Sequence, residues 1–489
     1  MSRKVLLLVA MAALILAFVG VVSASVGPLV LASGPSPFAA CTIGGTPDSV
    51  NYVNAEVEPW VAVNPVNSSN RIGVYQQDRW NDGGAHGLVA AVTHDAGLTW
   101  THTWAAFSLC SGGTVANGGD FERATDPWVT FAPNGAAYQI SVSFNALNPD
   151  NAVLVSKSTN GGDTWSAPTT LIRDTSAFNF NDKESITADP TNSNYVYAVW
   201  DRSRHPGGEP NVNAFHSYAF RGDPYFSRTT NGGASWEPAR KMFRRNKNIW
   251  TIGHQIVVQP DGTLVDSFNL GSGSGIQPSI HNWQAIMRST DKGASWSDPI
   301  VIAKDYDVDV RDPDNPDDFL RVGTFLADIA VDPNNGTLYV VWADGRFTGR
   351  AHADVVLSKS TDGGQTWSDP VKVAGTPSGI DSFTASVDVS ANGTVAVTYY
   401  DLRNNTADPN TLPTDYWIRY STNGGATWGA EQHVGGPFDM RTAPDAGGFF
   451  TGDYQGLDHF GNTFVPFFVQ ANSGNTANRT DAFATTATP

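Results

Sequence analysis

The chain has 489 residues, including 48 Gly and 15 Trp, and only 16% of its residues are charged. This length exceeds one ordinary core, so a repeat or ring architecture that grows by adding units is favoured. Abundant Gly and aromatic residues are typical of turn-rich, all-β proteins rather than helical ones. The formal net charge of −17 argues against nucleic acid as a partner, because phosphate binding needs a basic footprint that the chain as a whole lacks.

The N-terminus has the pattern of an export signal. Arg3 and Lys4 precede an apolar run from Val5 to Val22, and Val22-Ser23-Ala24 offers a small-residue cleavage site. We therefore predict a signal peptide over residues 1–25 and a secreted, extracellular protein. The alternative is an uncleaved anchor at the cell surface, because the apolar run is about long enough to span a bilayer. Only this segment is expected to contact a membrane.

Residues 26–48 contain many Gly, Pro and Ser residues and are predicted to form a linker before the folded domain. The chain holds two cysteines, Cys41 in this linker and Cys110. In an exported protein they are expected to form one disulfide, which would stabilise the fold by about 3 to 4 kcal/mol on loop-entropy grounds. The alternative is two unrelated thiols.

One eight-residue pattern, which we call the box, recurs six times at spacings of 60 to 71 residues. It reads Ser/Thr, any, Asp/Asn, any, Gly, any, Ser/Thr, Trp, and it occupies 93–100, 158–165, 229–236, 289–296, 360–367 and 421–428. This is the chemistry of a tight hairpin, in which the Asp or Asn folds onto backbone amides, Gly takes the positive φ and Trp anchors the turn. The third-position residues are therefore expected to be structural: Asp95, Asn160, Asn231, Asp291, Asp362 and Asn423.

The same order of strands recurs upstream of each box. A short apolar strand ends at a turn, as in Trp60 to Pro65, and a second strand follows, as in Tyr195 to Trp200. A third strand leads into the box, as in Asp354 to Lys359, and a fourth starts at the box Trp. Four strands per unit predict an all-β fold, a β-propeller of four-stranded antiparallel blades that covers residues 49–489.

The last repeat unit is incomplete. It starts at Gly452-Asp453-Tyr454-Gln455-Gly456, and the chain stops before any further box. Its missing outer strand is predicted to come from Ser49 to Val53, which would close the ring. We therefore predict seven blades, with six as the alternative.

The boxes resemble the BNR or Asp-box repeats of the sialidase superfamily and extend over essentially the whole chain from about residue 50. The resemblance implies a sialidase-like glycoside hydrolase, an exo-glycosidase that acts on terminal acidic sugars of glycans and requires no cofactor. Members generally use three Arg to bind the substrate carboxylate, an Asp as acid/base, and a Tyr nucleophile activated by Glu. The chain resembles a non-classical member, because the early Phe/Tyr-Arg-Ile-Pro motif is absent and the nearest string, Arg71-Ile72-Gly73, lacks the proline.

Charged residues gather where second strands end and where first strands begin. In a four-stranded antiparallel blade these two places lie on one face of the ring, opposite the boxes. After second strands come Gln77-Asp78-Arg79, Asp201-Arg202, Asp344-Gly345-Arg346 and Asp401-Leu402-Arg403. Before first strands come Glu58, Asp126, Asp182-Lys183-Glu184, His254, Asp328 and Asp453-Tyr454. We predict a site on this rim; the alternative is a set of Asp–Arg pairs that hold blade to blade.

The resemblance assigns roles to these residues by position. Arg202, Arg346 and Arg403 would bind the substrate carboxylate, and Asp201 or Asp344 would be the acid/base. Tyr454 with Glu184 would form the nucleophile pair. The remaining rim residues predicted to bind substrate are Arg79, His254 and Asp453.

Two other functions stay open at this stage. One is a propeller that binds a glycan or a protein without turnover. The other is a polysaccharide lyase, in which Tyr, His254 and Arg would neutralise a uronate and remove its C5 proton. We expect a monomer whose partner is a glycan or glycoconjugate, or a protein if the chain is a binding propeller.

Two further clusters stand out. Asp305, Asp307 and Asp309 begin an acidic stretch with enough carboxylates for a structural calcium ion, although the EF-hand pattern is not met and a solvated acidic loop is the alternative. Residues 240–247 contain five Arg and Lys residues, which would either attract an anionic glycan or form a solvated surface patch.

Overall fold

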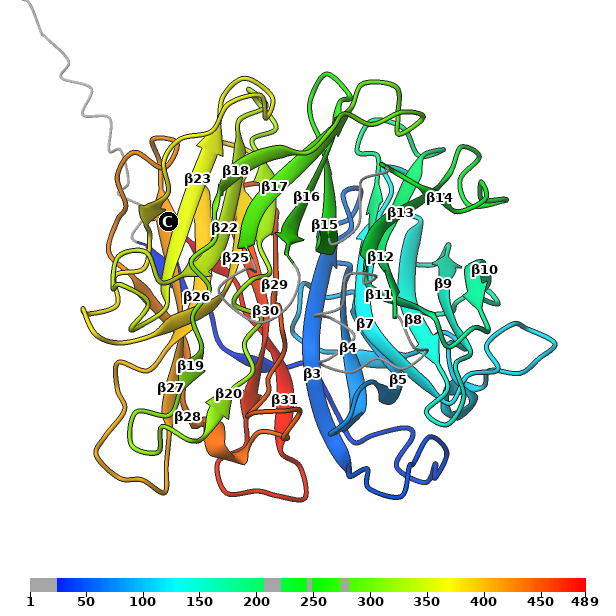
Figure 1. The fold of residues 1–489 in the computed structure, drawn as a ribbon, viewed down its shortest axis with the longest axis horizontal. Coiled ribbons are helices and arrows are strands. Elements are labelled where there is room, and N and C mark those ends of the chain that lie inside the picture. The colour runs from blue at the N-terminus through cyan, green and yellow to red at the C-terminus, as the bar shows by residue number, and fades with distance from the viewer. Residues whose placement is uncertain (1–23, 206–220, 244–248, 274–280) are drawn as a thin grey trace, which may run out of the picture.

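The computed structural model describes residues 24–205, 221–243, 249–273 and 281–489, and it shows an all-β propeller of four-stranded antiparallel sheets (Figure 1). The predicted fold class is therefore confirmed. None of the helices in these ranges has the length and apolar character needed to cross a bilayer. Almost all of the predicted signal peptide or anchor, 1–25, lies outside the described residues, as do Arg244, Arg245 and Lys247 of the basic run.

Each repeat unit forms one meander in which every strand is antiparallel to the next. The first two units are β3 (Asn51–Val63), β4 (Arg71–Trp80), β5 (Ala85–Thr93), β6 (Thr101–Thr103), then β7 (Arg123–Phe131), β8 (Ala137–Phe144), β9 (Asn151–Ser158) and β10 (Thr169–Asp174). The next two are β11 (Asn179–Ala188), β12 (Val196–Arg204), β13 (Arg221–Thr229), β14 (Arg240–Lys241), then β15 (Ile249–Val258), β16 (Leu264–Ser272), β17 (His281–Ser289) and β18 (Ile300–Lys304). Two more are β21 (Asp328–Val331), β22 (Leu338–Asp344), β23 (Asp354–Ser360), β24 (Val371–Lys372), then β25 (Ser382–Val389), β26 (Val395–Asp401), β27 (Pro413–Ser421) and β28 (Gln432–Asp439).

The last unit is completed by the start of the described chain. It contains β29 (Gly456–Phe460), β30 (Thr463–Ala471) and β31 (Thr480–Ala484), and β2 (Val30–Leu31) pairs with β31. A short pair between β1 (Ser25–Val26) and β32 (Ala487–Thr488) lies next to it. The predicted outer strand, Ser49 to Val53, was wrong, because β3 starts at Asn51 and pairs with β4 in the first unit.

The number of blades stays a prediction. Backbone bridges between β5 and β7, at Ala85 and Ala124, and between β3 and β31, at Ala55 and Thr480, join the first two units and the last one into a single 14-stranded sheet. Separate sheets therefore do not give the blade number directly.

The predicted disulfide is confirmed. Cys41 and Cys110 are bonded, with 5.8 Å between their Cα atoms, and Cys110 lies in a short 3-10 helix, η1 (Leu109–Ser111). The bridge spans 69 residues. It ties the segment predicted as a linker to the first unit, where Phe38 is buried against the side of β5 at Gly87.

The six boxes form the predicted tight turns between third and fourth strands. In the first box, Asp95 accepts hydrogen bonds from the backbone and hydroxyl of Thr99 at 2.9 and 2.6 Å, and Thr93 accepts one from the amide of Gly97 at 3.0 Å. These hydrogen bonds lower the pKa of Asp95 to about 2. Asn423 makes the equivalent bonds to Thr427, so the predicted structural role of this position is confirmed.

A short hairpin outside the repeat leads directly into Arg321. It comprises β19 (Val310–Arg311) and β20 (Phe319–Leu320), at the lower end of Figure 1. Arg441 in the 3-10 helix η2 (Met440–Thr442) forms ion pairs with Asp312 and Asp318 of this hairpin. The amide of Arg321, directly after β20, donates to the carbonyl oxygen of Phe449. These contacts hold the hairpin, and with it the backbone of Arg321, in place.

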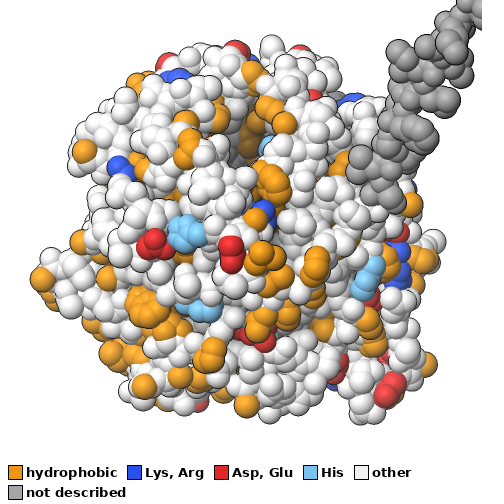
Figure 2. Space-filling model, turned by 180° about the vertical axis from the view of Figure 1, so that it is seen from behind, with side chains coloured by type: hydrophobic (Ala, Val, Ile, Leu, Met, Phe, Trp, Pro, Cys, Tyr) orange, Lys and Arg blue, Asp and Glu red, His pale blue; other side chains and the backbone are white. Residues whose placement is uncertain are grey.

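Most of the core lies between neighbouring sheets. Trp200 in β12 and Trp342 in β22, both second strands, are fully buried there. Figure 2 shows one face of the molecule, on which charged side chains are few and scattered among uncharged ones. A dense cluster of charged groups is instead buried near the inner strands.

Candidate functional site

The innermost strands share a bulge that directs side chains to one place. In β3, β7, β11, β15 and β25 the register against the second strand shifts, and one residue within each shift has a positive φ. Such a backbone is rare for residues other than Gly and is typical of bulges and functional sites. The five residues are Glu58 (54°), Asp126 (53°), Lys183 (47°), Gly253 (73°) and Thr384 (49°).

Three carboxylates meet the ammonium group of Lys183. Its Nζ lies 2.8 Å from Glu58 Oε1, 2.6 Å from Asp126 Oδ1 and 2.9 Å from Asp453 Oδ2. Arg321 binds the same Asp453 oxygen at 2.6 Å. The Lys183 side chain is only 10% exposed, so this charged group, which we call the Lys183 cluster, is largely shielded from water. Its members, Glu58, Asp126, Lys183, Arg321 and Asp453, come from five separate segments of the chain.

The Lys183 cluster displaces several pKa values. Burial raises the pKa of Glu58 to about 7, although Lys183 opposes this rise. Burial also raises the pKa of Asp126 and of the neighbouring Asp182. Burial disfavours the charge on Asp453 too, but Arg321 and Lys183 outweigh it and hold its pKa well below its usual value. The cluster thus combines a carboxyl group that is protonated near neutral pH with one that is always ionised.

A cleft of about 640 Å³ opens beside the Lys183 cluster. Its lining includes Glu58, Asp126 and Lys183 together with three arginines, Arg79, Arg123 and Arg321. Next to the cluster the ring axis narrows to a void of about 30 Å³, where the rings of Trp60 and Trp128 stack with centroids 3.4 Å apart. A ligand can therefore reach the charged groups through the cleft.

Arg79 differs from the other two arginines. It is 3% exposed, and among the described residues it has no carboxylate within ion-pair distance, while its Nε lacks a hydrogen-bond partner. Burial and the neighbouring Arg321 lower its pKa to about 10. The guanidinium groups of Arg79 and Arg321 lie 5.1 and 4.6 Å from the centroid of Phe450. Arg79 is the one predicted substrate-binding arginine that lines the cleft.

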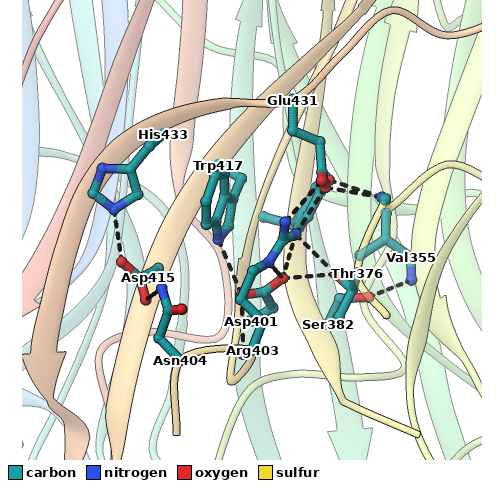
Figure 3. Close-up of polar contacts among 12 residues, drawn as sticks. Val355, Thr376, Ser382, Asp401, Arg403, Asn404, Asp415, Trp417, Glu431 and His433 are labelled. Carbon is teal, nitrogen blue, oxygen red and sulfur yellow. Dashed lines mark hydrogen bonds and ion pairs between the residues drawn. The ribbon is translucent and has the colours of Figure 1, made fainter. Parts of the chain in front are cut away.

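The three arginines predicted to converge on one carboxylate do not do so. Arg202 pairs with Asp174 at 2.8 Å, and Arg346 pairs with Asp344 at 2.8 Å. Arg403 lies between Asp401, at 2.5 Å, and Glu431, at 2.8 Å, with its guanidinium over Trp417 (Figure 3).

Local sequence explains two of these pairs. Asp344–Arg346 and Asp401–Arg403 are two residues apart at the end of a second strand, so the chain itself closes each pair. For these residues the alternative prediction, Asp–Arg pairs that hold blade to blade, agrees with the structure. For example, Arg346 also donates to the carbonyl oxygen of Lys304 in the preceding unit.

Asp344 and Asp201 are buried in other contacts. Asp344 is fully buried and accepts hydrogen bonds from Trp342 and the amide of Tyr306 in addition to Arg346. Asp201 accepts hydrogen bonds from Thr251 and from the amide of Gly253. Neither aspartate lines the cleft, so the structure does not bring these predicted acid/base residues to the Lys183 cluster.

His254 is held between two aspartates. Its Nδ1 lies 2.7 Å from Asp266 and its Nε2 lies 3.3 Å from Asp201, and its ring stacks on Phe268 at 4.6 Å. Burial disfavours the imidazolium, but Asp266 and Asp201 outweigh this and raise the pKa of His254 to about 10. A proton held this firmly is not available for exchange near neutral pH, which argues against His254 as the base of a lyase.

Tyr454 and Glu184 lie near the Lys183 cluster, as predicted. Lys183 Nζ is 5.6 Å from the centroid of the Tyr454 ring, and Glu184 lines the same narrow void. Tyr454 donates a long hydrogen bond of 3.4 Å to the carbonyl oxygen of Pro127, and none joins it to Glu184. Burial raises the pKa of both groups well above their usual values, which opposes formation of a tyrosinate.

The aspartates of the predicted calcium site serve separate partners. Asp305 accepts hydrogen bonds from Asn269 and Gln284, Asp307 accepts one from Thr324, and Asp309 pairs with Arg311. In the described ranges the one group of His, Cys, Asp and Glu side chains with metal-ligand spacing consists of Asp388, Asp458 and His459, within 4.8 Å of one another. These three line another cleft, of about 560 Å³, that also reaches Trp60 and Trp128.

Sequence reasoning missed Arg123 and Arg321. Arg123 is the first residue of the first strand β7, close to where the rim pattern was already evident. It pairs with Asp82 and donates to the carbonyl oxygens of Gly44 and Gly83. Arg321 follows the acidic stretch that was interpreted as a calcium loop. It directly follows the hairpin β19–β20, which lies outside the repeat, so the periodic pattern offered no signal for it.

Comparison with known proteins shows similarity to carbohydrate-active enzymes. No protein-family model matches the chain. A xyloglucanase from Paenibacillus sp is 27% identical over 231 residues, which are 45% of this chain and 19% of that protein. The chain therefore spans about a fifth of the length of this curated relative.

Solved structures with a similar fold include two sialidases and an arabinanase. The Hadza microbial sialidase Hz136 has a TM-score of 0.49 at 12% identity, over 85% of this chain and 73% of that chain. The leech intramolecular trans-sialidase has 0.46 at 11%, over 90% and 93%. An α-L-arabinanase from Penicillium chrysogenum has 0.44 at 11%, over 90% and 98%. Similarity at this level concerns the fold alone.

Proposed function

We propose that this protein is a secreted glycoside hydrolase of the sialidase-like, Asp-box type that acts on glycans ending in an acidic sugar. The observation that carries the proposal is the Lys183 cluster, in which the carboxyl groups of Glu58 and Asp126 lie close together on Lys183 beside a cleft lined by arginines. Glycosidases use such a pair, with one carboxylic acid to protonate the leaving oxygen and one carboxylate at the anomeric carbon.

Glu58 and Asp126 fit these two roles. Both contact Lys183 Nζ, at 2.8 and 2.6 Å, so their nearest oxygens are at most the sum of these distances, 5.4 Å, apart. Retaining glycosidases separate their carboxyl groups by about 5 to 5.5 Å, and inverting ones by about 6.5 to 9.5 Å. The spacing therefore favours retention of configuration.

In the proposed two-step reaction, one proton is transferred in each step. Protonated Glu58, with a pKa of about 7, gives its proton to the glycosidic oxygen as the C1–O bond breaks. Asp126 attacks C1 and forms a glycosyl ester. Ionised Glu58 then removes a proton from water, which attacks C1 and releases Asp126 as a carboxylate. Lys183, whose Nζ lies 2.6 Å from Asp126 Oδ1, favours the carboxylate form of Asp126 and opposes the burial that raises its pKa.

Arg79 supports recognition of an acidic sugar. A buried guanidinium that lines the cleft without a carboxylate partner in the described structure can bind a substrate carboxylate through two parallel hydrogen bonds. Arg321, near Arg79, adds positive charge. This pair takes the role that sequence analysis gave to Arg202, Arg346 and Arg403.

A panel of fluorogenic glycosides tests the proposal. The wild-type protein should release the fluorophore from a sialic acid, glucuronic acid or galacturonic acid glycoside, and Glu58→Gln and Asp126→Asn should each abolish release. Arg79→Lys should raise KM, because one ammonium cannot replace two parallel hydrogen bonds. Tyr454→Phe should retain activity, which separates Asp126 from Tyr454 as nucleophile. Folded wild-type protein with no turnover of any acidic glycoside would contradict the proposal.

A glycan-binding propeller without turnover is the second candidate. It is favoured by one observation: Lys183 contacts three carboxylates at once, which leaves these oxygens less free for chemistry. In this case acidic glycans should bind on an array, and binding should survive Glu58→Gln with no product formed.

A further inference from the structure

A second group of ionisable side chains lies towards the other end of the inner strands. The Lys183 cluster gathers near the starts of first strands, whereas Asp388 lies near the end of the first strand β25. Asp458 and His459 lie beside it in β29, the first strand of the last unit. The cleft of about 560 Å³ that these three residues line is also bordered by the prolines that follow the first strands of three other units. The cleft therefore belongs to the face of the ring that carries the boxes.

The three side chains have the spacing of ligands to one metal ion. His459 Nδ1 lies 2.7 Å from Asp388 Oδ2 and 3.9 Å from Asp458 Oδ1. Zn²⁺ lies about 2.0 to 2.2 Å from nitrogen and oxygen ligands, so two ligands of one ion are at most about 4.4 Å apart. Both measured separations meet this limit. The remaining separation, between the two carboxylates, is at most 4.8 Å and requires only a small rotation of one of them.

Backbone amides outside the group hold both carboxylates in this orientation. Asp388 Oδ1 accepts a hydrogen bond from the amide of Val389 at 2.8 Å, and Asp458 Oδ2 accepts one from the amide of Val63 in β3 at 2.6 Å. Hydrogen bonds of this kind are typical of carboxylates that bind metals, because they orient the ligand and leave its other lone pairs free. The donor atoms are therefore oriented before any ion binds.

The charge of the group also favours a cation. Two carboxylates share one imidazole, and neither forms an ion pair with a Lys or Arg side chain in the described ranges. Arg71 is near enough to interact with Asp458 electrostatically, but its Nε donates to the carbonyl oxygen of Ser68. Among the described residues that line the cleft there is no Lys or Arg. In the Lys183 cluster an ammonium group occupies the place between the carboxylates, and here no side chain takes that place.

We propose that Asp388, Asp458 and His459 bind one divalent transition-metal ion, represented by Zn²⁺. A mixed set of imidazole and carboxylate ligands suits Zn²⁺ better than Ca²⁺ or Mg²⁺, which bind oxygen ligands. The ion takes the place of the proton through which His459 Nδ1 contacts Asp388, and that proton is released to solvent. Water from the cleft completes the coordination.

The site connects two units next to the place where the ring closes. Asp388 belongs to the unit before the last one, Asp458 and His459 belong to the last, and the amide of Val63 belongs to the first. Between β3 and β31 the first and last units share one backbone bridge. An ion that binds the folded ring and not the unfolded chain stabilises the ring by mass action. This inference concerns stability and does not rest on the proposed hydrolysis.

Metal binding by the purified protein tests the site. After dialysis against EDTA and then against metal-free buffer, calorimetry with ZnCl₂ should show a site with a Kd of about 1 to 10 μM. Zn²⁺ at 100 times this Kd should raise Tm by about 2 to 5 °C. His459→Gln and Asp458→Asn should each weaken binding at least tenfold, and thermal unfolding in EDTA shows whether each variant is folded before metal is added.

The matched control is His433→Gln. His433 also pairs with an aspartate, Asp415 at 2.6 Å, but has no second carboxylate within ion-pair distance in the described structure. Zinc binding should therefore be unchanged in this variant. It should also be unchanged in Glu58→Gln, which alters only the Lys183 cluster.

Each outcome decides the matter separately from hydrolysis. Zinc binding that is lost in His459→Gln and Asp458→Asn and kept in both controls supports the site, whether or not any glycoside is cleaved. The absence of zinc binding by the wild-type protein overturns it, as does binding that His459→Gln leaves unchanged, because the three side chains then form only an ion pair between units. Tighter binding of Ca²⁺ than of Zn²⁺ also overturns it, since calcium binds oxygen ligands rather than imidazole.

Discussion

The Lys183 cluster and the Asp–Arg pairs at the ends of second strands contain the same residue types in opposite arrangements. Arg346 binds an aspartate two residues away, and that aspartate also accepts from Trp342, so the charges are matched locally. Lys183 instead meets carboxylates from three other segments. Opposite charges that pair within a few residues of each other stabilise the structure. Charged groups that several strands bring together shift one another's pKa values, which is typical of functional sites.

The largest effect is expected for Glu58→Gln. Loss of the general acid should lower kcat/KM by about 10² to 10⁴-fold on an acidic glycoside, because Gln cannot protonate the leaving oxygen. The measurement is steady-state turnover of the best fluorogenic substrate, with thermal unfolding to verify the fold. Wild-type turnover by this variant would show that the Lys183 cluster is not the catalytic centre.

Asp344→Asn should lower stability and leave activity unchanged, the opposite of Glu58→Gln. It leaves Arg346, whose side chain is 16% exposed, without its counter-charge, and should lower the free energy of unfolding by about 3 kcal/mol with kcat unchanged. Denaturant unfolding measures this loss. The control is Asp309→Asn, which breaks an exposed pair with Arg311 and should cost less than about 1 kcal/mol. A drop in kcat without loss of stability would place Asp344 in catalysis after all.

The pH dependence should follow Glu58. Since its pKa is about 7 and the acid form is required, kcat/KM should fall about tenfold per pH unit above pH 7. Burial raises this pKa above its unfolded value, so the contribution of Glu58 to stability is complete below about pH 4.5 and is lost as pH rises through 7. Glu58→Gln should remove this part of the pH dependence of unfolding, and Asp344→Asn should keep it.

The smallest effect is expected in a box. Asp362→Asn should change Tm by no more than about 2 °C, because Asn already occupies the same position in three other boxes. Asp362 accepts from the hydroxyl of Thr366, while the Nδ2 of Asn423 donates to that of Thr427, so the hydroxyl only reverses its role. A fall of more than 5 °C by calorimetry would show that the two residues are not equivalent.

The fold could be predicted well from the sequence because each feature of the repeat unit occurs several times. The box recurs six times with one hydrogen-bonding pattern, and the order of strands around it recurs too. Four of the predicted rim residues, Glu58, Asp126, Lys183 and Asp453, do meet in space, while the function of this rim stays a prediction. Position within a repeat unit is what a periodic sequence reports most directly.

The choice among rim residues could not be made from the sequence. Asp401 and Arg403 carry the same types of charge as Asp126 and Lys183, but only the fold shows that the first two bind each other and the last two bind across strands. The bulge depends on the register between two strands, which the local sequence does not record. Arg321 reaches the site from a hairpin outside the repeat, so periodicity could not locate it.

The bulge shared by five inner strands has a consequence for engineering. The bulge sets the direction in which the side chain leaves the strand. It occurs at five positions: Glu58, Asp126, Lys183, Gly253 and Thr384. Three of these positions carry ionisable side chains, and the other two carry a glycine and a threonine, which do not ionise. At Gly253 an added Cβ would lie 2.5 Å from the Leu326 side chain, so Thr384 is the better of the two places for a new functional group.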